Sequence, residues 1–248
     1  MEREADVSGI LGQTVEVLGA AGRAVITYVV VLGLFNGAGG LFGLASADDN
    51  FFSARFTDTM WETQTSSALE ALFGVCSMVL FVIASYVLLT QMMAATGRPM
   101  RNGARFWSFV GMSILAMIGV MIGFVFLVIP GIIVLVRWSA ANGFVLTGEH
   151  GITGSLGASW EATDGHGLSI FGAGLVVWIG LAVLSSVVLG VAYAGVGGGG
   201  GSFSPLLGLA TAISGLTEAF GNAVSFAFSI AVFHLVAPAD TSVADVFE

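Results

Sequence analysis

The stretch FLVIPGIIVLVRWSAANGFVLTGEHGITGSLGASWEATDGH, residues 126–166, carries the strongest structural signal in the chain. It places Pro130-Gly131 and the single charge of Arg137 inside an apolar run, and a polar, acidic segment follows at once. A charge inside hydrocarbon is costly, so an apolar run with one internal arginine is typical of a membrane protein in which that charge has a defined place. The stretch predicts a polytopic membrane protein with a structural turn at Pro130-Gly131, in which Arg137 is the first candidate for a charge with a functional or structural role.

The composition of the whole chain agrees with a membrane environment. Of the 248 residues 56% are hydrophobic and only 9% are charged, and the mean hydropathy is +0.96. A soluble domain carries about 25% charged residues. A chain with this composition could not cover its surface with polar groups in water, so lipid is expected to surround most of it.

Six apolar runs are long enough, or nearly so, to cross about 30 Å of hydrocarbon as helices. They cover residues 24–45, 68–95, 106–129, 132–147, 168–194 and 217–237. Backbone groups in lipid need partners within their own segment, which favours helices. The predicted fold is therefore one all-α integral membrane domain over residues 1–248, with a cytoplasmic segment 1–23, a transmembrane bundle 24–237 and a cytoplasmic tail 238–248.

The charges orient this bundle and exclude some classes of partner. The loop 97–105 holds three of the seven arginines, and arginine-rich loops stay in the cytoplasm. Six spans then place both termini in the cytoplasm, and the predicted location is the bacterial cytoplasmic membrane. With a net charge of −9 and no basic stripe, a nucleic-acid partner is not expected. The single cysteine, Cys76, excludes an intrachain disulfide.

Three polar segments have an apolar stripe at helical spacing. The stripes are Val7, Ile10, Leu11, Thr14 and Leu18; Phe52, Phe56 and Met60; and Ile152, Leu156 and Trp160. Each segment is either a short helix lying in the membrane interface or an ordinary loop helix packed on the bundle. The first and third also align without gaps, SGILGQTVEVLG with TGSLGASWEATD, with four identical residues. This similarity indicates an internal repeat or arises by chance in a chain rich in Gly and Leu.

Small residues recur every four positions in the last two spans. They are Gly215, Ala219, Ala223, Ala227 and Ala231 in the sixth, and Ala182, Ser186, Gly190 and Ala194 in the fifth. Two Gly-xxx-Gly pairs, Gly33/Gly37 and Gly119/Gly123, occur in the first and third spans. Because the hydrophobic effect does not drive helices together in lipid, close contact through small residues does so. We therefore expect spans five and six to cross tightly, with such stripes facing sister helices or another subunit.

Arg137 is expected to meet Glu218 at the start of the sixth span, with Asn222 one turn further on. Two interpretations stay open. The first is a gate or a site for an anionic headgroup, and the second is a structural ion pair that joins two spans.

His234 is the only histidine within a span and could ligate a haem or chlorophyll, but a b-type haem usually needs a second axial ligand. No metal site, other cofactor or catalytic residue is predicted, because no metal-ligand spacing, catalytic triad or phosphate-binding motif occurs.

The residues of the opening stretch resemble bacterial YciC-type inner-membrane proteins. They also resemble the related membrane domain fused to glycerophosphoryl diester phosphodiesterases. The matching positions are Ile129, Pro130, Gly131, Arg137, Glu149, Ser159, Trp160, Thr163, Gly165 and His166. The resemblance covers about forty residues and implies mainly a fold. It carries over no catalytic residue, because no phosphodiesterase domain is present in this sequence.

The abundance of packing motifs and the lack of recognisable chemistry predict a non-enzymatic membrane protein. The leading hypothesis is a structural or accessory subunit, or a scaffold, that docks on a larger membrane complex, with membrane lipids and other membrane subunits as partners. The alternative is a transporter, channel or lipid-handling protein that uses Arg137 and Glu218.

Overall fold

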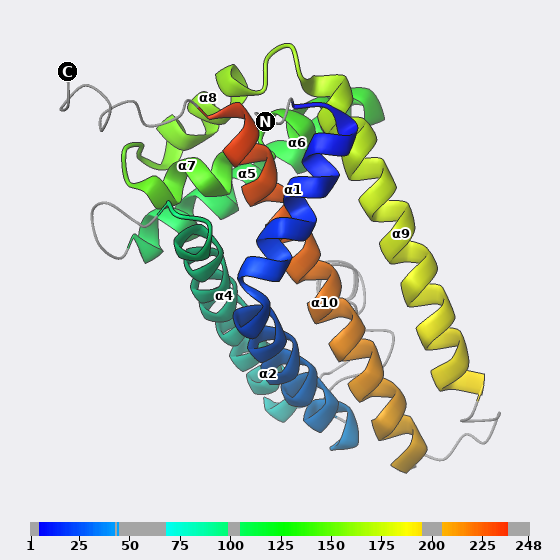
Figure 1. The fold of residues 1–248 in the computed structure, drawn as a ribbon. Helices are drawn as coiled ribbons and strands as arrows, with labels where there is room; N and C mark the ends of the chain where they lie inside the picture. The colour runs from blue at the N-terminus through cyan, green and yellow to red at the C-terminus, as the bar shows by residue number, and fades with distance from the viewer. Residues whose placement is uncertain (1–4, 43, 45–67, 99–104, 195–204, 238–248) are drawn as a thin grey trace. The chain divides into compact units, whose positions relative to one another are not determined.

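The computed structural model describes residues 5–42, 44, 68–98, 105–194 and 205–237, shown as ribbons in Figure 1. All regular structure in these residues is helical, which confirms the predicted all-α class. The helices are α1 (Val7–Ala20), α2 (Gly22–Leu41), α4 (Ala68–Ala95), α5 (Phe106–Phe126), α6 (Val128–Arg137), α7 (Ala141–Thr147), α8 (Ile152–Ala162), α9 (Gly167–Ala194) and α10 (Pro205–Val236). The predicted stripe at Phe52, Phe56 and Met60 lies outside the described residues.

The described part of the chain contains six segments that are long and apolar enough to cross a membrane. Five are single helices, and the fourth, Val128–Thr147, consists of α6 and α7. The chain is therefore a multi-pass membrane protein. The predicted span 68–95 matches α4, whereas α10 starts at Pro205, well before the expected residue 217. Proline suits a helix start, because the first N–H groups of a helix have no intrahelical partner.

The turn expected at Pro130-Gly131 lies earlier in the structure. The chain reverses at Leu127, whose extended backbone (φ −170°, ψ 153°) separates α5 from α6. Pro130 sits in the first turn of α6, where its missing N–H costs no hydrogen bond. Gly123 and Gly131 let α6 approach α5, since a Cβ on Gly123 would lie 2.9 Å from the Gly131 Cα and one on Gly131 would lie 2.6 Å from the Phe124 ring.

The chain divides into two compact units. Unit 1 consists of Met1–Ala21, Leu89–Val177 and Phe226–Glu248, and unit 2 of Gly22–Leu88 and Trp178–Ser225. Helices α4, α9 and α10 contribute residues to both units. The expectation of a single domain over residues 1–248 stays a prediction.

Unit 1 contains α1 and the group of helices from α5 to α8. In this group α5 packs on α6, α7 and α8, and α8 packs on α7 and α6; Figure 1 shows the four together. The Asp6 side chain caps α1 by accepting from the Gly9 N–H at 2.7 Å. The buried face of α1 is Ile10, Thr14 and Val17, which includes two members of the predicted apolar stripe.

Unit 2 is built on close contacts of α2 with α10 and α4. A Cβ placed on Gly37 would lie 2.7 Å from the Ala212 Cβ, and Gly33 lies against Leu216. On the α4 side, the rings of Phe35 and Phe73 stack with their centroids 4.9 Å apart. The glycines of α2 thus allow α10 to approach its backbone.

Candidate functional site

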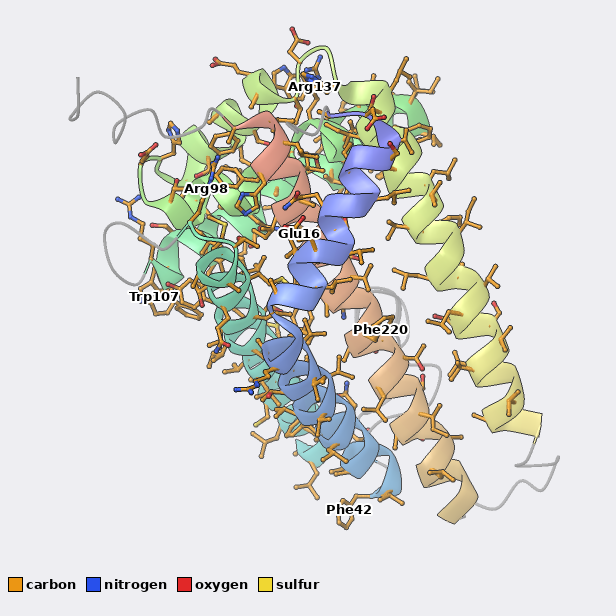
Figure 2. All side chains as sticks on the ribbon, viewed as in Figure 1. Glu16, Phe42, Arg98, Trp107, Arg137 and Phe220 are labelled. Atoms are coloured by element: carbon orange, nitrogen blue, oxygen red, sulfur yellow. The ribbon has the colours of Figure 1, made fainter. Side chains whose placement is uncertain are left out.

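Arg137, the last residue of α6, lies at the centre of a cluster with α8 and the turn that follows it. We call Arg137, Ser159, Trp160, Thr163 and Asp164 the Arg137 cluster. The guanidinium forms an ion pair with the Asp164 carboxylate, with 2.7 Å between Nη2 and Oδ1. It also donates to the Trp160 carbonyl at 3.3 Å, and its Cζ lies 5.5 Å from the centre of the Trp160 ring. Figure 2 labels Arg137, beside the segment that joins α8 to α9.

The backbone carbonyl of Arg137 is held by α8 as well. Ser159 Oγ donates to it at 2.7 Å, and Thr163 Oγ1 lies 3.3 Å away. Both hydroxyl residues are fully buried. The last carbonyls of a helix lack intrahelical partners, so these hydroxyls satisfy a group that would otherwise be costly to bury.

The break between α6 and α7, residues 138–140, is also fixed from α10. The Ser139 carbonyl accepts a hydrogen bond from Ser229 Oγ at 2.6 Å, and Asn142 Nδ2 donates to the same Ser229 Oγ at 3.0 Å. On the α5 side, Gly119 leaves room for the ring of Trp138. The predicted continuous run 132–147 is therefore interrupted where the Ser229 hydroxyl of α10 supplies the Ser139 carbonyl with a hydrogen bond from outside the helix.

These contacts explain much of the sequence pattern in residues 126–166. Ser159 and Thr163 are four residues apart, so one face of α8 presents both hydroxyls to α6. Gly165 has a positive φ of 78°, a conformation that favours glycine, in the turn before α9. In that turn His166 Nδ1 lies 3.0 Å from the Asp164 carbonyl oxygen. The pattern therefore has a structural role in joining α6, α8 and the start of α9.

The electrostatics of the Arg137 cluster are those of an ion pair at a surface. The hydrogen bond and the charge of Arg137 hold the pKa of the Asp164 carboxyl below its usual range. The Asp164 side chain is 78% exposed and that of Arg137 only 23%, so water reaches the carboxylate more readily than the guanidinium. An exposed pair contributes little to stability, and the buried hydroxyls hold the junction more strongly.

Asp164 is a partner for Arg137 that the sequence analysis did not select. Its signal was the four-residue spacing of Trp160 and Asp164, which brings the turn after α8 to the same arginine as the end of that helix. The expected partners, Glu218 and Asn222, lie on the part of α10 that belongs to unit 2. Their pairing with Arg137 stays a prediction.

The two stripes of small residues have different surroundings. Every member of the α10 stripe is buried: Gly215, Ala219, Ala223, Ala227 and Ala231. On α9, Ala182, Ser186 and Gly190 are all exposed. In unit 2 the small residues of α10 face the glycines of α2, and α9 reaches α10 through the larger Leu181, near Gly221. The expected close crossing of spans five and six through their small residues is thus corrected to one of spans one and six.

The histidines form hydrogen bonds and ring contacts. His234 Nε2 lies 2.7 Å from Thr96 Oγ1, so the nitrogen that could ligate a haem iron has a hydroxyl neighbour. The His150 carbonyl accepts from Arg105 Nη1 at 2.8 Å, and the His150 ring packs edge-on against Phe144. Among the described residues, no three His, Cys, Asp or Glu side chains form a group that could hold a metal ion. Cofactor binding by His234 stays a prediction.

No protein-family model, curated protein or solved structure matches the chain. The resemblance to YciC-type proteins therefore stays a prediction, carried by the residues of the opening stretch. What the geometry itself provides is a joint between helices, built from buried hydroxyls and one surface ion pair.

Proposed function

We propose that the chain is a non-enzymatic structural or accessory subunit that docks on a larger membrane complex through α9. The observation that carries this proposal is the exposure of α9, in which no residue from 174 to 192 is buried. By contrast, buried residues make up 44% of the most apolar window of the α10 span.

The proposed docking surface is the row Ala182, Ser186 and Gly190. These residues are exposed and recur every four positions, which allows the backbone of another helix to approach closely. The Ser186 hydroxyl donates to the Ala182 carbonyl at 2.7 Å, so its hydrogen bond is made within α9. Residues 178–192 carry no charge. The occupant that fits is an uncharged transmembrane helix of another subunit with small residues of its own.

The test is purification in mild detergent, followed by identification of membrane proteins that co-purify. A variant with Ala182→Leu, Ser186→Leu and Gly190→Leu fills the row and is expected to lose the partner. The matched control is Val183→Leu, Val187→Leu and Val191→Leu, at exposed positions next to the row. Equal recovery of the partner with both variants, or a functional protein that purifies without a partner, would contradict the proposal.

The contacts of Arg137 favour this structural function over transport or lipid handling. Its guanidinium is already engaged by Asp164 and Trp160. The competing function requires Arg137→Ala to abolish flux or lipid binding in a protein that remains folded. The structural function requires the same substitution to lower the stability of the protein instead, by a small amount because the ion pair is exposed.

The proposed location is the bacterial cytoplasmic membrane, with both termini in the cytoplasm. The arginine-rich loop 97–105 supports this orientation. A reporter active only in the cytoplasm, fused in turn to each terminus, should be active in both fusions. Activity of an exported reporter at either terminus would reverse the assignment.

A further inference from the structure

Helices α2 and α4 of unit 2 place polar side chains opposite each other at two levels. At the first, Ser77 Oγ donates to Asn36 Oδ1 at 3.3 Å. At the second, the hydroxyls of Tyr28 and Ser85 lie 3.4 Å apart. Both steps, from Asn36 to Tyr28 and from Ser77 to Ser85, are eight residues, which is about 12 Å of helix. The helices therefore keep one antiparallel register between the two levels.

Helix α10 packs against α2 as well, in a register that its close contacts define. Gly37 lies against Ala212, and Gly33 against Gly215 and Leu216, so α2 and α10 are antiparallel. Five residues further along, this register brings Tyr28 opposite residues 220–221 of α10. Glu218 is less than one helical turn of about 3.6 residues from that level.

The polar groups at the second level are deeply placed. Tyr28 is 4% exposed and Ser85 only 1%. Glu218 itself is half-buried, and the register places it close enough for its charge to act on the Tyr28 hydroxyl. An acid inside a transmembrane helix is rare and usually functional, and binding a proton removes its charge from the membrane.

We propose that Glu218, with the hydroxyls of Tyr28 and Ser85, forms a proton-binding site inside the membrane. The Glu218 carboxyl takes up and releases one proton, and the two hydroxyls donate to its charged form. This site goes beyond docking through α9 and does not depend on it, since it lies between α2, α4 and α10.

Four other titratable or charged side chains are described on these helices of unit 2. They are Arg23 on α2 and Glu70, Cys76 and Tyr86 on α4. Arg23 is exposed, and Glu70 is in the first turn of α4, far along that helix from Ser85. Tyr86 is buried beside Ser85 in sequence and serves below as a control.

The test uses dicyclohexylcarbodiimide, a hydrophobic reagent for protonated carboxyls, on the full-length protein in lipid nanodiscs. The acid O–H adds across a C=N bond to give an O-acylisourea, and the acyl group then migrates to nitrogen to give a stable N-acylurea. No group leaves, so peptide mass spectrometry should find one whole reagent molecule on Glu218. Labelling is expected to fall as pH rises and to vanish in Glu218→Gln, while Glu70→Gln retains it.

The partners of Glu218 are tested by the pH profile of labelling. Tyr28→Phe and Ser85→Ala each remove a hydroxyl donor that favours the charged carboxylate, so labelling should persist to higher pH, by about one pH unit. Tyr86→Phe should leave the profile unchanged. Size-exclusion chromatography identifies folded variants, and Ser85→Ala keeps the test valid if Tyr28→Phe does not fold.

Three results would overturn the proton site. The first is a folded protein in which Glu218 stays unlabelled at every pH. The second is a pH profile that neither Tyr28→Phe nor Ser85→Ala moves. The third is protection of Glu218 by sodium ions at constant pH, which would make it a metal-cation site. All are measured on the isolated chain, so they are separate from loss of a partner through α9.

Discussion

Helices α10 and α9 carry the same sequence pattern, small residues every four positions, but only α10 buries it. Gly215, Ala219 and Ala223 are buried in unit 2, whereas Ala182 and Ser186 are exposed on α9. The pattern allows a close approach but does not choose the neighbour. In unit 2 the α10 stripe packs against α2, whose glycines leave room for it. For the α9 stripe we propose that the neighbour is a helix of another subunit.

The start of α9 differs from the rest of that helix. Ile170 and Ala173 are buried in unit 1, and the preceding turn is held by Arg137 and Asp164. Beyond residue 173 no described side chain of α9 is buried. The helix is thus anchored at its beginning and half-buried or exposed along the rest of its described length.

The largest expected effect comes from filling the contact between α2 and α10. Gly37→Leu places a side chain where even a Cβ would lie 2.7 Å from Ala212, so we expect a loss of about 3 kcal/mol or more, or no folded protein. The control on α9 is Gly180→Leu, where nothing lies within 4 Å of a Cβ. Thermal unfolding in detergent measures both, and equal stability of the two variants would contradict the comparison.

A smaller effect is expected at the joint before α9. Ser159→Ala removes the hydrogen bond to the Arg137 carbonyl and leaves that group with the longer Thr163 contact, which should cost about 1–3 kcal/mol. Ser155→Ala is the matched control, because Ser155 is equally buried on α8 but donates within its own helix, to Gly151. The unfolding temperature of Ser159→Ala should be lower than that of Ser155→Ala. The reverse order would contradict a stabilising role of the hydrogen bond between Ser159 and the Arg137 carbonyl.

The stripe on α9 should tolerate change in the isolated chain. Ala182→Leu combined with Ser186→Leu adds volume at exposed positions, so stability should stay within about 0.5 kcal/mol of the natural chain. Urea unfolding of the purified protein checks this. A loss as large as that of Gly37→Leu would mean that the α9 stripe, like that of α10, packs within the chain.

The smallest expected effect concerns the pH dependence of the Arg137 cluster. Because Asp164 has a lowered pKa in the folded protein, its stabilising contribution is present above the usual aspartate pKa of about 4. It is lost as the pH falls through the lowered folded value. Asp164→Asn should therefore lower the unfolding temperature slightly at neutral pH and lose this difference in acid. A difference that grows in acid would contradict the sign.

The membrane spans could be predicted from the sequence because a long run of apolar residues is itself sufficient to indicate a helix surrounded by lipid. The run 68–95 matched α4, and the class of the fold followed from composition. The break at residues 138–140 could not be predicted, because it depends on Ser229 and Trp138 meeting groups from distant parts of the chain. The partner of Arg137 was missed for a similar reason: the sequence shows several acids and only the folded α8 places Asp164 within reach.

The most direct test of the account is photo-crosslinking from α9 in native membranes. A photoreactive amino acid is placed singly at positions 182, 186 and 190, and in matched variants at positions 183, 187 and 191. The account predicts that the first set forms crosslinks to another membrane protein and that the second set forms markedly fewer. Crosslinks only to lipid from both sets, or only within the chain from positions 182, 186 and 190, would contradict docking through α9.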